Sequence, residues 1–202
     1  MTETLNTNHK LEITWYLEFD GSVNKLGAGA GIWIHNTHNN HAEGHAYRLN
    51  FKCTNNVVEY EALLLGLKLL KALGAAKVSI LRDSDLVIQQ MKGNFVTNDR
   101  RLRAYRTVAT AILDTFTESK LAKISRSNNM HAHNLANFAS TCKLPFVSNH
   151  HFTAEIKHRL AVPNNVKDWQ VFEDDAQINN FITLQHEFAG LNIDMDTMMD
   201  EQ

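Results

Sequence analysis

The sequence predicts an α/β protein in which helices flank a five-stranded mixed sheet whose first three strands are antiparallel. Three segments near the start alternate apolar and polar residues and are joined by short connections, as expected for an antiparallel meander. Helix-like and strand-like segments then follow one another up to about residue 142, which is the order of a mixed sheet with helices packed on its faces. The 202 residues include two cysteines, too few for a disulfide framework.

The three antiparallel strands come first. One is predicted over residues 11–19, where apolar side chains occupy every second position, and it ends at Asp20 and Gly21. The next covers residues 27–35, GAGAGIWIH, whose glycines let another backbone approach closely. The third alternating stretch covers residues 46–51.

Helical spacing begins after the third strand. A long helix is predicted over residues 54–74, because Thr54 and Asn55 are good helix caps, apolar residues recur at helical spacing, and Gly74 ends the run. The later elements are expected as strand, helix, helix, strand and helix, in this order, at residues 77–84, 85–93, 99–118, 121–126 and 131–142.

Charge divides the chain into two regions. Residues 1–143 hold 17 Lys and Arg against 12 Asp and Glu, whereas residues 144–202 hold 3 against 10. We therefore expect a flexible N-terminus at 1–10, a folded domain at 11–143 that can meet phosphates, and an acidic extension that is partly helical or disordered and could bind a protein partner. The sequence shows neither a leader peptide nor a long apolar run, which predicts an intracellular protein, cytoplasmic or nuclear, that is not secreted and has no membrane partner.

Three acids stand at the ends or starts of predicted elements. Asp20 ends the first strand, Glu59 lies in the first turns of the long helix, and Asp83 ends the fourth strand. If these strands are neighbours and the helix crosses them, the three carboxylates converge. Crowded carboxylates repel one another, so such a cluster needs a cation, and oxygen ligands favour Mg²⁺ or Mn²⁺. Each acid alone could be an exposed cap or turn residue, but their combined placement predicts a metal site.

Four motifs occur in a fixed order: YLEFDGS with GAGAGIWI, then FKCTNNVVEYEALLLGL, RDSDLVIQQMKGNF and ISRSNNMHAHNLANFA. Over about residues 11–142 the chain resembles the type I ribonuclease H domain, in the form found in gypsy-type LTR retrotransposons and their plant relatives. The resemblance implies a ribonuclease H-like sheet. It also implies a retrotransposon-derived endonuclease that hydrolyses the RNA strand of RNA–DNA hybrids.

The resemblance further implies that Asp20, Glu59 and Asp83 are catalytic acids holding two Mg²⁺ or Mn²⁺ ions, which prepare the attacking water and stabilise the leaving 3′ oxygen. The family's fourth acid belongs in the pattern R-x-x-N-x-x-A-D-x-L-A, and His133 stands here in place of that aspartate. A neutral imidazole brings one lone pair and no charge, and it suits Mn²⁺ better than Mg²⁺.

Two outcomes follow from this replacement. His133 can serve as a fourth catalytic and metal-binding residue with weakened activity. Alternatively, the site has decayed and the chain is an inactive module that binds nucleic acid or protein.

A hybrid duplex is recognised by its shape, its phosphates and its 2′-hydroxyls. Glycine and serine backbone permits close approach, asparagine side chains offer amide groups, and arginine offers positive charge. The predicted substrate-binding residues are Gly21, Ser22, Thr54, Asn55, Asn56, Arg126 and Asn129. The three at the helix start could equally be plain helix caps.

Overall fold

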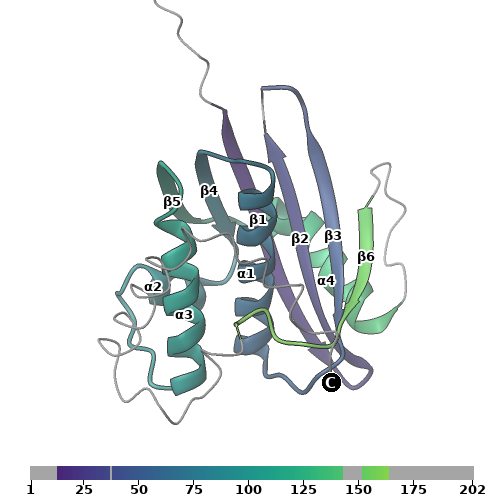
Figure 1. Cartoon of the computed structure of the whole chain (residues 1–202). Coiled ribbons are helices and arrows are strands. Elements are labelled where there is room, and N and C mark those ends of the chain that lie inside the picture. The colour runs from purple at the N-terminus through teal and green to yellow at the C-terminus, as the bar shows by residue number, and fades with distance from the viewer. Residues whose placement is uncertain (1–12, 37, 143–151, 164–202) are drawn as a thin grey trace, which may run out of the picture.

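The computed structural model describes residues 13–36, 38–142 and 152–163. They form one mixed sheet with the strand order β5-β4-β1-β2-β3-β6 (Figure 1). The antiparallel strands are β1 (Thr14–Asn24), β2 (Gly27–Asn36) and β3 (Ala42–Leu49). The parallel pairings are made by β4 (Lys77–Arg82), β5 (Glu118–Lys123) and β6 (Phe152–Lys157). The predicted mixed α/β class with an antiparallel first half is confirmed.

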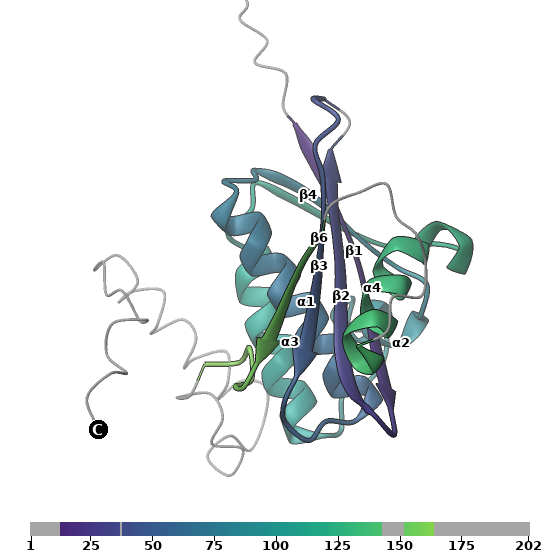
Figure 2. The ribbon, with the colours of Figure 1, turned by 90° about the vertical axis from the view of Figure 1, so that its right-hand side faces the viewer.

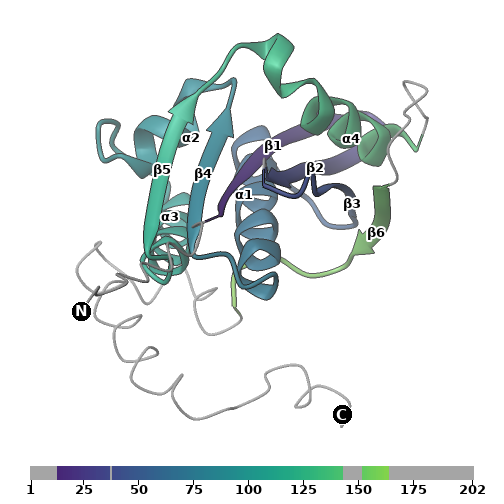
Figure 3. The same cartoon turned by 90° about the horizontal axis from the view of Figure 1, so that it is seen from above.

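Helices cover both faces of this sheet. Figure 2 shows the sheet from its edge, with α1 (Asn55–Ala72) and α3 (Arg100–Leu113) on one side and α4 (Met130–Thr141) on the other. The same separation of α1 from α4 is visible from above in Figure 3. Two short elements complete the described chain, α2 (Asp85–Met91) after β4 and the 3₁₀ turn η1 (Arg126–Asn129) before α4.

Strand β1 faces two environments. Leu17 and Phe19 are fully buried in the main core, beneath α1. Because strand side chains alternate, Glu18 and Asp20 lie on the opposite face, where α4 packs. Strand β1 also pairs in parallel with β4, as far as Glu18 and Leu81. The prediction that Asp20 ends the first strand is wrong, because β1 continues to Asn24 in its antiparallel pairing with β2, but Asp20 does lie just beyond the part of β1 that pairs with β4.

The glycines of β2 allow α4 to lie directly on the strand. A Cβ added to Gly31 would overlap the carbonyl oxygen of Ala132, and one added to Gly29 would overlap the backbone of Ser140. The close backbone approach that these glycines predict is therefore made by α4, which places the start of that helix above the strand ends.

Some boundaries differ from those expected. Strand β5 begins and ends three residues earlier than the predicted 121–126, because the chain pairs with the β4 edge as soon as it leaves the helix, where the Thr117 N–H donates to the Ala76 carbonyl. The predicted helix 99–118 ends at Leu113.

The sheet has six strands rather than five. Strand β6 lies within the segment expected to be an acidic extension, and it pairs with β3. After it, Ala161 and Val162 are buried in the main core, where the Ala161 N–H donates to the Glu61 carboxylate at 2.9 and 3.0 Å. The N-terminus at 1–10 and most of 144–202, with its expected helix, lie outside the described residues.

Among the helices that the structure describes, none is long and apolar enough to span a membrane.

Candidate functional site

The three acids Asp20, Glu59 and Asp83 are brought together, and they meet around Arg82. The Arg82 Nη1 atom lies 2.5 Å from Asp20 Oδ1 and 2.6 Å from Asp83 Oδ1, and Nη2 lies 2.9 Å from Glu59 Oε1. The cluster is almost closed to solvent, with the Arg82 side chain 4% exposed, Asp20 7%, and the other two 14% each. We refer to these four residues as the carboxylate centre.

Each acid reaches this point from a different element. Asp20 lies on β1 and Asp83 directly follows β4, so the parallel pairing of the two strands places both at the same edge. Glu59 comes from the second turn of α1, which lies close to Gly21. A Cβ at Gly21 would come within 2.9 Å of the Glu59 backbone nitrogen, so the absence of a side chain there lets the helix approach the strand.

The charges in the centre do not balance. Three carboxylates face one guanidinium, and the buried Glu59 Oε2 atom has no hydrogen-bond partner. Burial raises the pKa of Glu59 above its usual range, although Arg82 acts in the opposite direction. Burial alone would lower the pKa of Arg82, but the three carboxylates raise it. Arg82 therefore stays charged, and it neutralises one of the three negative charges.

His133 stands beside Asp20. Its Nδ1 atom lies 2.7 Å from Asp20 Oδ2, and its Nε2 atom lies 2.9 Å from Asn137 Nδ2 and 3.3 Å from Arg126 Nη2. A guanidinium can only donate, so Nε2 is the acceptor and Nδ1 carries the hydrogen that is donated to Asp20. In this arrangement the imidazole lone pair points toward Arg126 and away from the acids.

Asn129 is fully buried and forms a hydrogen bond to the carboxylate centre. Its side-chain amide donates to Asp83 Oδ1 at 2.9 Å and to the Phe19 carbonyl at 3.2 Å. In the structure this residue ties η1 to the strand ends, and its Oδ1 atom has no hydrogen-bond partner. Arg126, by contrast, is exposed beside His133.

The remaining predicted substrate-binding residues differ in their exposure and in their hydrogen bonds. Thr54 caps α1 by accepting from the Val57 N–H at 3.4 Å, Asn55 is exposed and Asn56 is partly exposed. The Ser22 hydroxyl is bonded to two polar side chains of α4. The capping geometry is thus present at Thr54, and contact of these residues with a duplex stays a prediction.

Sequence reasoning missed Arg82. The signal was present, because Val78 and Ile80 alternate along β4 and put residue 82 at the next position of the buried face. A charged side chain at a core position must find partners there. The three acids that are its partners in the structure were predicted from the sequence to bind a metal ion instead.

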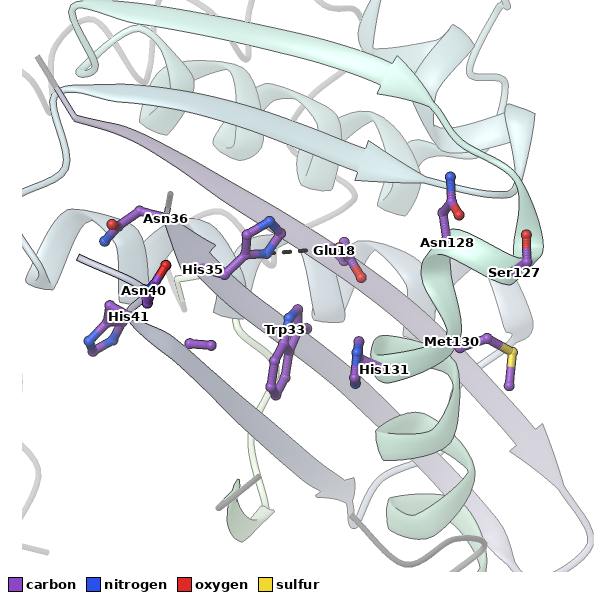
Figure 4. A pocket seen from close by; sticks show the side chains of 11 residues that line it. Glu18, Trp33, His35, Asn36, Asn40, His41, Ser127, Asn128, Met130 and His131 are labelled. Carbon is purple, nitrogen blue, oxygen red and sulfur yellow. Dashed lines mark ion pairs between the residues drawn. The ribbon is translucent and has the colours of Figure 1, made fainter. Parts of the chain in front are cut away.

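A hollow of about 660 Å³ lies on the α4 side of the sheet, between β1, β2 and the start of α4 (Figure 4). At its floor Glu18 is 7% exposed, with Oε1 3.9 Å from His35 Nδ1 and Oε2 without a partner. Burial raises the pKa of Glu18 to about 7. The rings of Trp33 and His131 stack at its edge, with their centroids 4.4 Å apart.

The donor chemistry of the carboxylate centre fits a divalent cation. The acids Asp20, Glu59 and Asp83 supply hard oxygen ligands and a charge that Arg82 only partly balances, and the unpartnered Glu59 Oε2 is a buried acceptor. Within the described ranges, no group of three His, Cys, Asp or Glu side chains is arranged to hold an ion, since the acids are turned toward Arg82. An ion and Arg82 would therefore use the same oxygens.

This sheet order, with acids where the parallel pairing of two neighbouring strands ends and on the helix that crosses them, defines a ribonuclease H-like domain. The chain belongs to the family described as reverse transcriptase-like, which matches residues 18–139.

Curated relatives share the same region. The chain is 33% identical over 119 residues to the bifunctional protein Rv2228c of Mycobacterium tuberculosis, a match that covers 59% of this chain and 32% of that protein. It is 35% identical over 88 residues to ribonuclease HI of Halobacterium salinarum, covering 44% of each. The chain thus spans less than half the length of these relatives.

Solved structures agree with this assignment. The N-terminal ribonuclease H domain of Rv2228c has a TM-score of 0.57 and 30% identity, covering 64% of this chain and 95% of that chain. Ribonuclease H1 of Halobacterium salinarum has a TM-score of 0.55 and 29% identity, with coverages of 63% and 96%. LC11-RNase H1, solved in complex with an RNA/DNA hybrid, has a TM-score of 0.53 and 27% identity, with the same coverages.

Proposed function

We propose that this chain is a ribonuclease H-type endonuclease that hydrolyses the RNA strand of RNA–DNA hybrids, with an activity weakened at its fourth ligand position. The observation that carries this proposal is the convergence of Asp20, Glu59 and Asp83 from three elements on one cationic point. The similarity to ribonucleases H, one of them solved with a hybrid, supports the choice of substrate.

In this proposal Asp20, Glu59 and Asp83 hold the divalent metal, Mg²⁺ or Mn²⁺. When bound, the metal supplies a nucleophilic water and a counter-charge for the leaving 3′ oxygen. The protein side chains orient the acids. Asn129 fixes Asp83 through its amide, and His133 fixes Asp20 through its Nδ1–H.

The approach to the centre is suited to a phosphate backbone. Arg126 is exposed next to His133 and brings a positive charge to the edge of the site. The start of α1 offers the exposed Asn55 and the partly exposed Asn56. Gly21 and Ser22 lie on the neighbouring strand, so these residues together form the proposed surface for the hybrid.

His133 accounts for the weakening. It adds no negative charge, and its lone pair is engaged by Asn137 and Arg126. If a bound ion turns the imidazole and takes its nitrogen as a ligand, activity with Mn²⁺ should exceed activity with Mg²⁺. The retrotransposon-type lineage is a further part of the proposal, and it rests on the resemblance of the motifs.

A second function is favoured by Arg82. Because this residue already neutralises part of the acid cluster, a phosphate backbone could approach the centre without metal and with less repulsion. In that case the chain is an inactive module that binds hybrids or, through its acidic extension, another protein.

A cleavage assay separates these two functions. A hybrid with a labelled RNA strand is incubated with the wild-type protein and with His133→Asp, in Mg²⁺ and then in Mn²⁺, while hybrid binding is measured in parallel with chelator present. The nuclease proposal predicts wild-type cleavage that is faster in Mn²⁺, and Mg²⁺-dependent cleavage that rises in the aspartate variant. A wild-type protein that binds but never cuts, and cuts only as His133→Asp, would instead be a binding module.

A further inference from the structure

Arg82 contacts every acid of the carboxylate centre. Its two terminal nitrogens reach Asp20, Glu59 and Asp83 at 2.5 to 2.9 Å, and Nη1 also donates to the Phe19 carbonyl at 3.2 Å. The guanidinium carbon lies 5.6 Å from the centre of the Phe19 ring. Only 4% of the Arg82 side chain is exposed, so this arginine is buried and its position is fixed by these contacts.

These contacts use the oxygens that a metal ion would need. One oxygen of each acid is directed at the guanidinium, and the second oxygen of Asp20 accepts from His133. The second oxygen of Glu59 is the buried acceptor without a partner. An ion that enters must therefore share these ligands with Arg82 or displace it.

Charge limits how many ions can enter. With all three acids ionised, the centre carries a net charge of −2 after Arg82 is counted, and the neutral His133 adds nothing. One divalent ion would balance this charge. Two would leave an excess of positive charge in a site nearly closed to water, which is costly at low effective dielectric constant.

We propose that Arg82 is a resident cation that takes the place of one divalent ion, so that the centre binds at most one ion and binds it in competition with this arginine. The inference rests on the proposed function in one respect, because it takes the carboxylate centre to be the metal site. It adds a residue that limits metal affinity and therefore the rate of RNA cleavage.

The test measures metal binding without nucleic acid. Mn²⁺ is titrated into the full chain, with free Mn²⁺ followed by electron paramagnetic resonance, for the wild type and Arg82→Gln. The wild type should bind no more than one ion. Arg82→Gln should bind Mn²⁺ at least about tenfold more tightly, because a positive charge a few ångströms from the ligands has been removed. Two ions on the wild type, or an affinity no tighter in Arg82→Gln, would overturn the proposal.

Two further variants serve as a control and as a replacement if Arg82→Gln does not fold. Arg101→Gln removes an exposed arginine of α3 and should leave the Mn²⁺ affinity at the wild-type value. Circular dichroism shows whether Arg82→Gln folds, since it leaves three buried carboxylates without a counter-charge. If it does not, Arg82→Lys is titrated instead. This variant keeps the charge but cannot bridge three acids, and it should still bind Mn²⁺ more tightly than the wild type, whereas equal or weaker binding would overturn the proposal.

Thermal unfolding gives an independent readout. Added Mn²⁺ should raise the melting temperature of Arg82→Gln, or of the lysine variant, by more than that of the wild type, because a ligand of the folded state stabilises it by RT ln(1 + [L]/Kd), which is larger when Kd is smaller. An equal or smaller rise would count against Arg82 as a competitor. Cleavage of hybrids plays no part in these measurements, so a chain that never cuts RNA could still confirm the competition, and an active nuclease could still refute it.

Discussion

Glu18 should make the stability of this protein depend on pH. The side chain lies at the floor of the hollow on the α4 side of the sheet, 7% exposed, and one of its oxygens has no partner. Burial raises its pKa from 4.5 to about 7. The folded state therefore holds this proton more tightly than the unfolded state does, so the stabilising contribution is fully present below about pH 4.5 and is lost as the pH rises through about 7.

The size of the effect follows from the shift. At about 1.4 kcal/mol per pKa unit, the rise corresponds to about 3 kcal/mol, of which about 2 to 3 kcal/mol falls between pH 5 and pH 8. Glu18→Gln keeps the shape of the side chain and cannot ionise. Relative to the wild type, the variant should gain this amount of unfolding free energy when the pH is raised over that interval.

The assay is urea unfolding of both proteins at the two pH values without metal, followed by tryptophan fluorescence. Glu118→Gln serves as the control, because Glu118 lies in surface ion pairs with Lys77 and Lys120 and its pKa is lowered, so its stabilising charge is present throughout the interval. A stability difference between Glu18→Gln and the wild type that is the same at both pH values would show that Glu18 does not titrate in this interval.

Three other substitutions test how the centre and its supports are held, each by urea unfolding. Gly31→Ala should lower the free energy of unfolding by at least about 2 kcal/mol, because the added Cβ would overlap the backbone of α4. Hybrid cleavage should fall as well, because His133 is displaced with the helix. Unchanged stability would contradict this packing. Asn129→Ala should cost about 2 kcal/mol through the lost bonds to Asp83 and the Phe19 carbonyl, and a cost near zero would show that these bonds do not form. Glu61→Ala should cost about 3 kcal/mol, because the Tyr105 hydroxyl and the Ala161 N–H both donate to this fully buried carboxylate, and limited proteolysis should then cut near residue 161; an unchanged digest would contradict that anchoring role.

Much of the fold could be predicted from apolar spacing. Leu17 and Phe19 alternate toward the core as a half-buried strand requires, and Thr54 caps the long helix where the sequence predicts its start. Strand β6 could not be found in this way. Most of its side chains are exposed, and it is held mainly by backbone pairing with β3, which leaves little apolar pattern to read.

The three acids of the site could be predicted from the sequence, but the part played by Arg82 could not. Asp20 and Asp83 lie where the pairing of β1 with β4 ends, and Glu59 lies near the start of α1, so their convergence follows from the order of the elements. The role of Arg82 depends on a long side chain at the end of β4 that reaches acids from two other elements. The tautomer of His133 likewise depends on Asn137 and Arg126, whose approach is decided by how α4 packs on β2.

Whether the carboxylate centre is catalytic is tested most directly by the fate of the RNA strand when an RNA–DNA hybrid is incubated with the protein and Mn²⁺. A catalytic carboxylate centre predicts internal cuts in the RNA that leave 3′-hydroxyl and 5′-phosphate ends, an intact DNA strand, and loss of cutting in Asp20→Asn. An RNA strand that stays whole with the wild type, or cuts that persist when Asp20 is replaced, would contradict it.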